Sequence, residues 1–363
     1  MWGEVEAILD EALASRLFAG CALCVNTKQG QTLNVAIGKA EIRPNRREAN
    51  LNTVWDLASL TKVLATTPLM MRLVGGGQIK LDTPIREWLP WVHPQITARH
   101  CLSHTSGLPN WKPFFETFSD QQQWGTPQVR QAVFRAAGMS VLSETPGQNH
   151  TYSDLGFMVL GDLIETIHGD RLDMIWQREI GRYCEGQLLW GCSDAAATED
   201  CPVRGRVLVG EVHDLNAAVL GGVAPHAGLF ASAQDVAKAA DWQLASWNGD
   251  ASRGLKPEVV REFWAYVGQG SHRLGWDSPS VTASSASSRW PLEGVGHLGF
   301  TGGSLWIAPR QGVTVALCSN RVHPEVEGGA RPGAEGPKTA QFRRFRPRLF
   351  EAVVTACDAS GLW

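Results

Sequence analysis

At residues 55–62 the chain reads Trp55-Asp56-Leu57-Ala58-Ser59-Leu60-Thr61-Lys62. The next twelve residues, 63–74, are apolar with almost no charge, which predicts a buried helix that begins near Ser59. Because Ser59 and Lys62 are three residues apart, such a helix places both side chains on one face. A serine hydroxyl becomes a nucleophile when a neighbouring base takes its proton, and a lysine whose pKa is lowered by burial can do this. The stretch predicts a nucleophilic serine whose oxyanion the helix N-terminus would stabilise.

The pattern Ser-x-x-Lys is short, and a surface serine beside a solvated lysine is the alternative. The rest of the chain therefore has to decide between the two. Its 363 residues are 44% hydrophobic, which is ample for a substantial core. Its formal net charge is only -3, with acids and bases interspersed, so neither nucleic acid nor an anionic membrane is expected as a partner. We expect a small-molecule substrate and leave the oligomeric state open.

The N-terminus carries four acidic residues among its first eleven, whereas a secretion signal is basic and then apolar. The sequence has no uncharged apolar run of about 18 residues, so we expect no membrane insertion. Its eight cysteines are scattered, several of them in apolar runs, as is typical of buried thiols in a reducing compartment. Cys21 and Cys24 lie in a predicted strand, where they face opposite ways. We expect a cytoplasmic protein without a disulfide framework.

Both ends of the chain carry strand patterns. An amphipathic helix pattern over 5–18 is followed by a hairpin, and strands return near the C-terminus before a closing helix that is predicted to start at Pro347. The predicted strands cover 21–27, 32–37, 304–308 and 313–319. These patterns predict an α/β (α+β) fold in which an antiparallel sheet, flanked by helices, is built from both chain ends.

Helical patterns dominate the middle of the chain. The predicted helices there cover 96–103, 157–168, 172–183 and 233–246. We expect a sheet domain made of residues 1–60 and 255–363, with a mostly helical domain, 61–254, inserted into it. The cleft between the two is the expected ligand site, and Ser59 lies at this junction.

Two further motifs belong to this predicted cleft. The first, Tyr152-Ser153-Asp154, follows a turn at 145–148 and precedes a helix. The second is the stretch His297-Leu298-Gly299-Phe300-Thr301-Gly302-Gly303, whose glycines at a strand edge let a substrate backbone approach the sheet. Both motifs carry side chains that can bind or transfer protons.

Together, Ser59-Leu60-Thr61-Lys62, Tyr152-Ser153-Asp154 and His297-Leu298-Gly299 resemble the three ordered motifs of serine β-lactamases and penicillin-binding proteins. The match is closest to the class C branch, which also holds D-alanyl-D-alanine carboxypeptidases, family VIII esterases and cell-wall amidases. Supporting segments extend the resemblance over most of the chain. They are Asp82 and Pro84, residues 102–109, residues 228–233 and residues 345–348.

The resemblance implies a role for each motif residue. Ser59 would be the acylated nucleophile, with Lys62 and Tyr152 sharing its proton and passing it to the leaving group. The backbone N–H groups of Ser59 and Phe300 would form the oxyanion hole. The remaining motif positions, Asp154, His297 and Gly299, would bind substrate. The resemblance implies no cofactor and no metal.

Two departures from the family pattern change charge. Relatives that bind β-lactams commonly have Asn where this chain has Asp154, and Lys-Thr-Gly where it has His297-Leu298-Gly299. A neutral histidine holds a substrate carboxylate weakly, so we expect weak β-lactam hydrolysis. An ionised Asp154 near Lys62 would keep that lysine charged, which favours Tyr152 over Lys62 as the base.

Other residues offer rival sites. His213, Asp214, Asn216 and His226 are close in sequence, but their spacing matches no known metal motif, and a loop beside the cleft is the preferred interpretation. Two more side chains, His104 and Ser106, form a second nucleophile pair. Because glycine and proline follow them directly, a capping or packing role is favoured.

The sequence thus predicts a serine hydrolase that acts through an acyl-enzyme, with a carboxylesterase as the favoured type. A muropeptide amidase, a D-alanyl-D-alanine carboxypeptidase or a weak β-lactamase are alternatives within the same mechanism. A ligand-binding or structural protein without catalysis is the third possibility, since Asp154 and Leu298 could mark lost activity. Neither the acyl group nor the leaving group follows from the residues.

Overall fold

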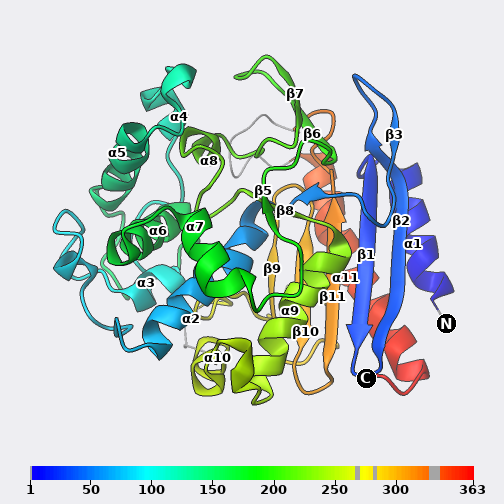
Figure 1. Cartoon of the computed structure of the whole chain (residues 1–363). Coiled ribbons are helices and arrows are strands. Elements are labelled where there is room, and N and C mark those ends of the chain that lie inside the picture. The colour runs from blue at the N-terminus through cyan, green and yellow to red at the C-terminus, as the bar shows by residue number, and fades with distance from the viewer. Residues whose placement is uncertain (1, 266–269, 281–283, 327–335) are drawn as a thin grey trace.

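The computed structural model describes residues 2–265, 270–280, 284–326 and 336–363. Its centre is a six-stranded antiparallel sheet in the order β3-β2-β1-β11-β10-β9 (Figure 1). The strands are β1 (Gly20–Thr27), β2 (Gly30–Glu41), β3 (Arg47–Glu48), β9 (Val295–Leu298), β10 (Ser304–Ala308) and β11 (Val313–Ser319). Because β1 pairs with β11, the two chain ends meet in the middle of the sheet. The predicted sheet built from both ends is confirmed.

Strands β1 and β11 alternate between two kinds of side chain. Leu23 and Leu317 belong to a cluster with α1 (Gly3–Ala14) and α11 (Pro337–Ala359). The small residues between them, such as Ala22 and Cys318, belong to the cluster that includes α9 (Ala233–Trp247), a helix that packs on β1 and β11 (Figure 1). This period of two places helices on both faces of the sheet. It also separates Cys21 from Cys24, which lie in the two different clusters, and all eight cysteines are free.

The helical part lies beside the sheet, between β4 and β9 in sequence (Figure 1). Its helices are α2 (Thr67–Gly75), α3 (Ala98–Leu102), α4 (Phe114–Thr117), α5 (Pro127–Gly138), α6 (Asp154–His168), α7 (Leu172–Trp176), α8 (Leu215–Val219), α9 and α10 (Pro257–Phe263). Its short strands are β4 (Trp55–Asp56), β5 (Leu189–Trp190), β6 (Ala197–Cys201), β7 (Arg206–Val209) and β8 (Leu229–Ala231). Among the helices of the described residues, none is long and apolar enough to cross a membrane. The domain boundaries stay a prediction. Helix α9, which lies within the predicted helical domain 61–254, packs on β1 and β11 of the sheet.

The helix that follows Ser59 is irregular at its start. A 3₁₀ turn at Ala58–Leu60 leads into a π-helical turn at Lys62–Thr66, and regular α2 begins only at Thr67. Ala58 has a φ of 46°, a left-handed conformation that is uncommon for a residue with a Cβ atom. Such strained or widened turns occur often at functional sites. They persist only where surrounding contacts stabilise them.

Three predicted helices differ from the structure. The first, predicted over 5–18, is α1 and ends at Ala14. The helix predicted over 172–183 is α7 followed by a π-helical turn at Gln177–Gly181. The last helix begins at Pro337 and carries Pro347 inside it. Both prolines suit a first helical turn, so the local signal cannot choose between them. The ten extra residues are helical because they bury Phe342 and Phe345 against the core.

The alternation along β1 predicts a large energetic difference between two leucines. Leu23 is fully buried in the central strand, whereas Leu292 is 67% exposed. We expect Leu23→Ala to lower the free energy of unfolding by about 2–5 kcal/mol, because it removes buried surface and leaves a cavity. Leu292→Ala is the matched control and should change it by less than about 0.5 kcal/mol. Denaturant unfolding of both variants measures this, and equal effects would contradict the assigned register.

Candidate active site

The turn that carries Ser59 is held by the residues before it. The carboxylate of Asp56 accepts hydrogen bonds from the backbone N–H of Ala58 at 2.8 Å and of His213 at 2.6 Å. Its backbone carbonyl accepts the Thr301 hydroxyl at 2.7 Å. Asp56 therefore ties the nucleophile turn to the loop after β9. Sequence analysis assigned no role to Asp56, although an aspartate two residues before a turn N–H is a known local signal.

Lys62 is completely buried beside Ser59. Its Nζ lies 3.1 Å from Ser59 Oγ, 2.7 Å from Asp154 Oδ1 and 3.2 Å from the carbonyl oxygen of His226. Burial by itself would lower the pKa of Lys62, but the charge of Asp154 and the hydroxyl of Tyr152 raise it above its ordinary value. Lys62 is therefore an ammonium that donates to Ser59, and Asp154 is its counter-ion.

Tyr152 stands next to this ion pair, with Lys62 Nζ 5.0 Å from the centre of its ring. Burial raises the pKa of Tyr152 above its ordinary value, although Lys62 partly opposes this. The phenol and the ammonium thus both hold their protons in the resting protein at neutral pH. One of them has to lose a proton before either can act as a base, and which one does so stays open.

His104 positions the loop that carries Tyr152. Its Nδ1 accepts the backbone N–H of Ser153 at 3.0 Å, and its carbonyl accepts the N–H of Thr151 at 2.8 Å. Ser106 accepts the N–H of Leu108 at 3.3 Å. Neither His104 nor Ser106 lines the cavities at Ser59 that are described below. These contacts are those of a packing and capping pair.

The third motif ends the edge strand β9. His297 Nδ1 lies 2.9 Å from the carbonyl oxygen of Leu298, so this nitrogen carries the proton and Nε2 does not. Burial, followed by the charge of Lys62, holds the pKa of His297 well below its usual range. His297 is neutral at pH 7 and supplies no fixed charge for a carboxylate. A Cβ atom at Gly299 would come within 2.8 Å of the Leu57 carbonyl, so this position requires glycine.

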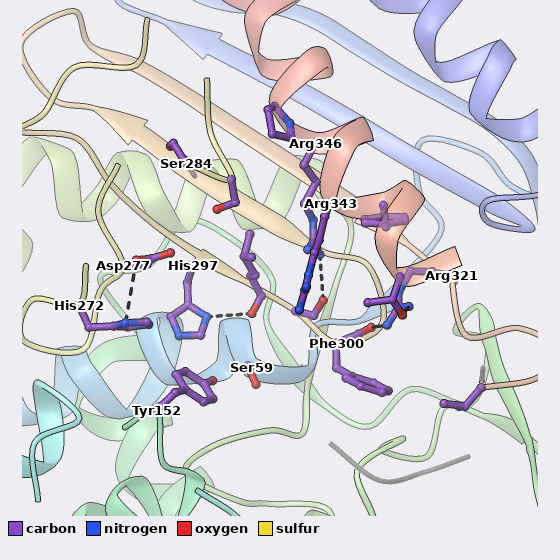
Figure 2. Close-up of a pocket in the computed structure, with 17 residues that line it drawn as sticks. Ser59, Tyr152, His272, Asp277, Ser284, His297, Phe300, Arg321, Arg343 and Arg346 are labelled. Carbon is purple, nitrogen blue, oxygen red and sulfur yellow. Dashed lines mark hydrogen bonds and ion pairs between the residues drawn. The ribbon is translucent and has the colours of Figure 1, made fainter. Parts of the chain in front are cut away.

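Two cavities meet at Ser59, Tyr152 and Phe300. The larger has a volume of about 810 Å³, and the smaller, which we call the small chamber, about 130 Å³. Figure 2 shows the larger cavity, with Tyr152, His297 and Ser59 at one end and three arginines near Phe300. Those arginines are Arg321, Arg343 and Arg346. The small chamber is lined by Ala58, Ser59, Trp111, Tyr152, Asp154, His213, Asp214, Leu215, His226, Ala227 and Phe300.

All seven predicted site residues thus lie around one point. The structure places Phe300 at the rim with 37% exposure, and its carbonyl accepts a hydrogen bond from Arg321 at 2.8 Å (Figure 2). The oxyanion-hole role of the Ser59 and Phe300 N–H groups stays a prediction, as do the catalytic roles.

The segment around Asp214 does lie beside the cleft. In the described part of the chain, no group of three or more His, Cys, Asp or Glu side chains is arranged to hold a metal ion.

Four histidines form a cluster at Tyr152, three of them in ring contact with it and His150 stacked on His272, a feature that sequence spacing did not reveal. They are His104, His150, His272 and His297, with ring centres of His104 and His272 only 4.7 Å apart. His150 Nε2 lies 3.0 Å from His272 Nδ1, and Asp277 is 4.0 Å from the same atom. Burial lowers the pKa of every member, that of His272 to about 4. The cluster is therefore neutral at pH 7.

This cluster predicts a loss of stability in acid. In the unfolded chain His272 binds a proton below about pH 6.5, but in the folded protein only below about 4, so stability falls as the pH drops between these values. From pH 7 to pH 5 we expect the wild type to lose about 2 kcal/mol more unfolding free energy than His272→Gln. Denaturant unfolding at both pH values measures the difference. Equal losses in the two proteins would contradict a depressed pKa.

Comparison with known proteins agrees with this geometry. The chain is 27% identical over 350 residues to the N-acetylmuramyl-L-alanine amidase of Bacillus subtilis (strain 168), covering 86% of this chain and 77% of that protein. The structure is similar to EstCE1, a hydrolase with promiscuous acyltransferase activity, with a TM-score of 0.74, 18% identity and 97% of each chain covered. It is also similar to the D-amino acid amidase of Ochrobactrum anthropi SV3, with a TM-score of 0.71, 21% identity and 98% of each chain covered.

The similarity to these structures concerns the fold. The beta-lactamase family model matches residues 5–336, which is nearly the whole chain and includes all three motifs. The resemblance inferred from Ser59, Tyr152 and His297 is thereby confirmed. With its nucleophile turn, buried lysine and edge strand in the arrangement described above, this chain belongs to the beta-lactamase family.

Proposed function

We propose that this protein is a serine hydrolase that acts through an acyl-enzyme on Ser59, and that its substrates are carboxylic esters. The observation that carries the proposal is the contact of the buried Lys62 ammonium with Ser59 Oγ at 3.1 Å, at the junction of two cavities. Lys62 donates to the serine oxygen, which leaves the serine proton free to pass to another acceptor. Tyr152 lines both cavities together with Ser59.

The reaction begins when the site loses one proton, from Tyr152 or Lys62. Ser59 Oγ then bonds to the carbonyl carbon of the ester while its proton passes to the group that lost one. The N–H groups of Ser59 and Phe300 would stabilise the oxyanion. The carbon–oxygen bond to the leaving group breaks, and the group that took the serine proton returns it to that oxygen. Water then attacks the acyl-enzyme by the same steps and releases the acid.

An ester is favoured over a β-lactam because the site offers a neutral His297 where a lysine would hold the β-lactam carboxylate. An amide is the second candidate, and the similarity to the Bacillus subtilis amidase supports it. The small chamber, about 130 Å³ in volume, favours a short acyl group over a muramyl group. Hydrolysis of N-acetylmuramyl-L-alanine, compared with p-nitrophenyl acetate and butyrate, discriminates between the two candidates.

The first test concerns the nucleophile. Ser59→Ala should lose the covalent adduct with a fluorophosphonate, seen by intact-protein mass, and should lower ester kcat at least about 10³-fold. Ser106→Ala is the matched control and should keep both the adduct and turnover, because Ser106 lines neither cavity. If the wild type forms no adduct and turns over neither p-nitrophenyl ester, a binding or structural role replaces the proposed function.

The second test concerns the protonation state of Lys62 and Tyr152. Asp154 raises the pKa of both Lys62 and Tyr152, and one of them must lose a proton for attack. The ester kcat/KM should therefore rise with pH above neutrality. In Asp154→Asn this ascending limb should move to lower pH, since the removed charge held the proton in place. A pH–rate profile that does not move would refute the coupling between Asp154 and the Lys62–Tyr152 pair.

A further inference from the structure

The small chamber differs in character from the larger cavity that it joins at Ser59. Two carboxylates line it, from Asp154 and Asp214, and none of the described residues that line it is a lysine or an arginine. Trp111 and the histidines His213 and His226 line it as well, and the Phe300 ring, which also borders it, is stacked against His213 and lies under the Arg321 guanidinium. Carboxylates beside aromatic rings form a typical environment for a cation. The chamber therefore favours a positively charged group next to the nucleophile.

Of the two carboxylates, Asp154 already has the Lys62 ammonium at 2.7 Å. Asp214 has no lysine or arginine beside it in the chamber; its partner is His226, which forms an ion pair with it only when the imidazole is protonated. Its Oδ1 accepts the backbone N–H of Ala217 at 2.7 Å and lies 3.1 Å from His226 Nε2. Its side chain is 27% exposed. Both contacts are made by Oδ1, and within the described residues Oδ2 accepts no hydrogen bond. Asp214 thus offers a carboxylate oxygen to whatever occupies the chamber.

Asp214 is also ionised when a substrate arrives. Burial would raise its pKa, but His226 and the hydrogen bond from the Ala217 N–H lower it to about 2. The negative charge is therefore present at every pH at which an ester hydrolase is assayed. A neutral acyl group in this chamber would remove water from the Asp214 carboxylate without offering it a hydrogen bond or an opposite charge. This desolvation of a charged group is unfavourable in free energy.

The acyl group and the leaving group lie on opposite sides of the carbonyl carbon that Ser59 attacks, so each cavity takes one of them. Tyr152 lines both cavities and does not distinguish them, but the larger cavity, about 810 Å³ in volume, has room for leaving groups of many sizes. We therefore assign the leaving group to the larger cavity and the acyl group to the small chamber. A volume of about 130 Å³ suits an acyl group of a few heavy atoms.

We propose that the small chamber selects a short acyl group that carries a protonated amine, with the carboxylate of Asp214 as the counter-ion of that ammonium. This inference rests on the proposed acyl-enzyme function and names its substrate class: small aminoacyl esters. Asp154 is the counter-ion of Lys62, whereas Asp214 would bind the ammonium of the substrate. Trp111 also lines the chamber and would place an indole ring beside the ammonium, whereas the Phe300 ring is already in contact with His213 and Arg321.

The test compares two esters that differ only in the group concerned. Alanine methyl ester, as D and L forms, carries an ammonium where methyl isobutyrate carries a methyl group. At pH 6.5 the amine is protonated, since its pKa is near that of an α-amino group, about 8. We measure kcat and KM for both esters by methanol release, and take the ratio of their kcat/KM values as the selectivity. Intrinsic differences in reactivity cancel when this selectivity is compared between variants.

Asp214→Asn should lower the selectivity about tenfold or more, chiefly through a higher KM for alanine methyl ester. Asparagine keeps an oxygen that can accept the Ala217 N–H, so the start of α8 is preserved. The matched control is Asp250→Asn, which removes the same charge from a capping aspartate that lines neither cavity. Its selectivity should equal that of the wild type, within a factor of two.

The outcomes separate the two proposals. If Ser59 labels with the fluorophosphonate and methyl isobutyrate is turned over, but Asp214→Asn leaves the selectivity unchanged, the ammonium site is refuted and the hydrolase stands. The same conclusion follows if Asp250→Asn lowers the selectivity as much as Asp214→Asn does. If neither ester is turned over and Ser59 does not label, the hydrolase itself is refuted, and the inference falls with it.

Discussion

The buried Lys62 ammonium is the constraint on which the site depends. A charge removed from water is tolerated only where acceptors surround it, and Lys62 finds them in the Ser59 hydroxyl, the Asp154 carboxylate and the His226 carbonyl. These acceptors come from the nucleophile turn, the start of α6 and the segment before β8. The ion therefore holds three distant segments at one point, and it places the serine where the two cavities meet.

Burial is the main reason why the histidines of the cluster are neutral, and it lowers the pKa of all four. The charge of Lys62 lowers the pKa of His104, His272 and His297 further. Asp154 balances the cation, and Asp214 adds a second carboxylate to the lining of the small chamber. Three arginines, Arg321, Arg343 and Arg346, line the larger cavity near Phe300 (Figure 2). The cleft is thus polarised across the nucleophile, with its acidic side at the small chamber.

The fold delivers these groups through simple rules of packing. Alternation of large and small residues along β1 and β11 lets helices cover both faces of the sheet, and β9 remains as an edge strand facing the cleft. Gly299 then allows the end of β9 to approach the Leu57 carbonyl, which sets the distance between the third motif and the nucleophile turn. Asp56 closes the same junction through Thr301.

The sequence by itself determined the elements and the chemistry-bearing residues. Ser59, Lys62 and Tyr152 stand out because local spacing and turn signals depend only on neighbouring residues, and the period of two in β1 and β11 marks the sheet. The family resemblance also led us to expect an ionised Asp154 near Lys62 and a neutral His297. Only the tertiary structure revealed the complete burial of Lys62 and the histidine cluster, because these arise from contacts between residues far apart in the chain, and no sequence period encodes those. The start of the last helix, at Pro337 rather than Pro347, was likewise decided by packing.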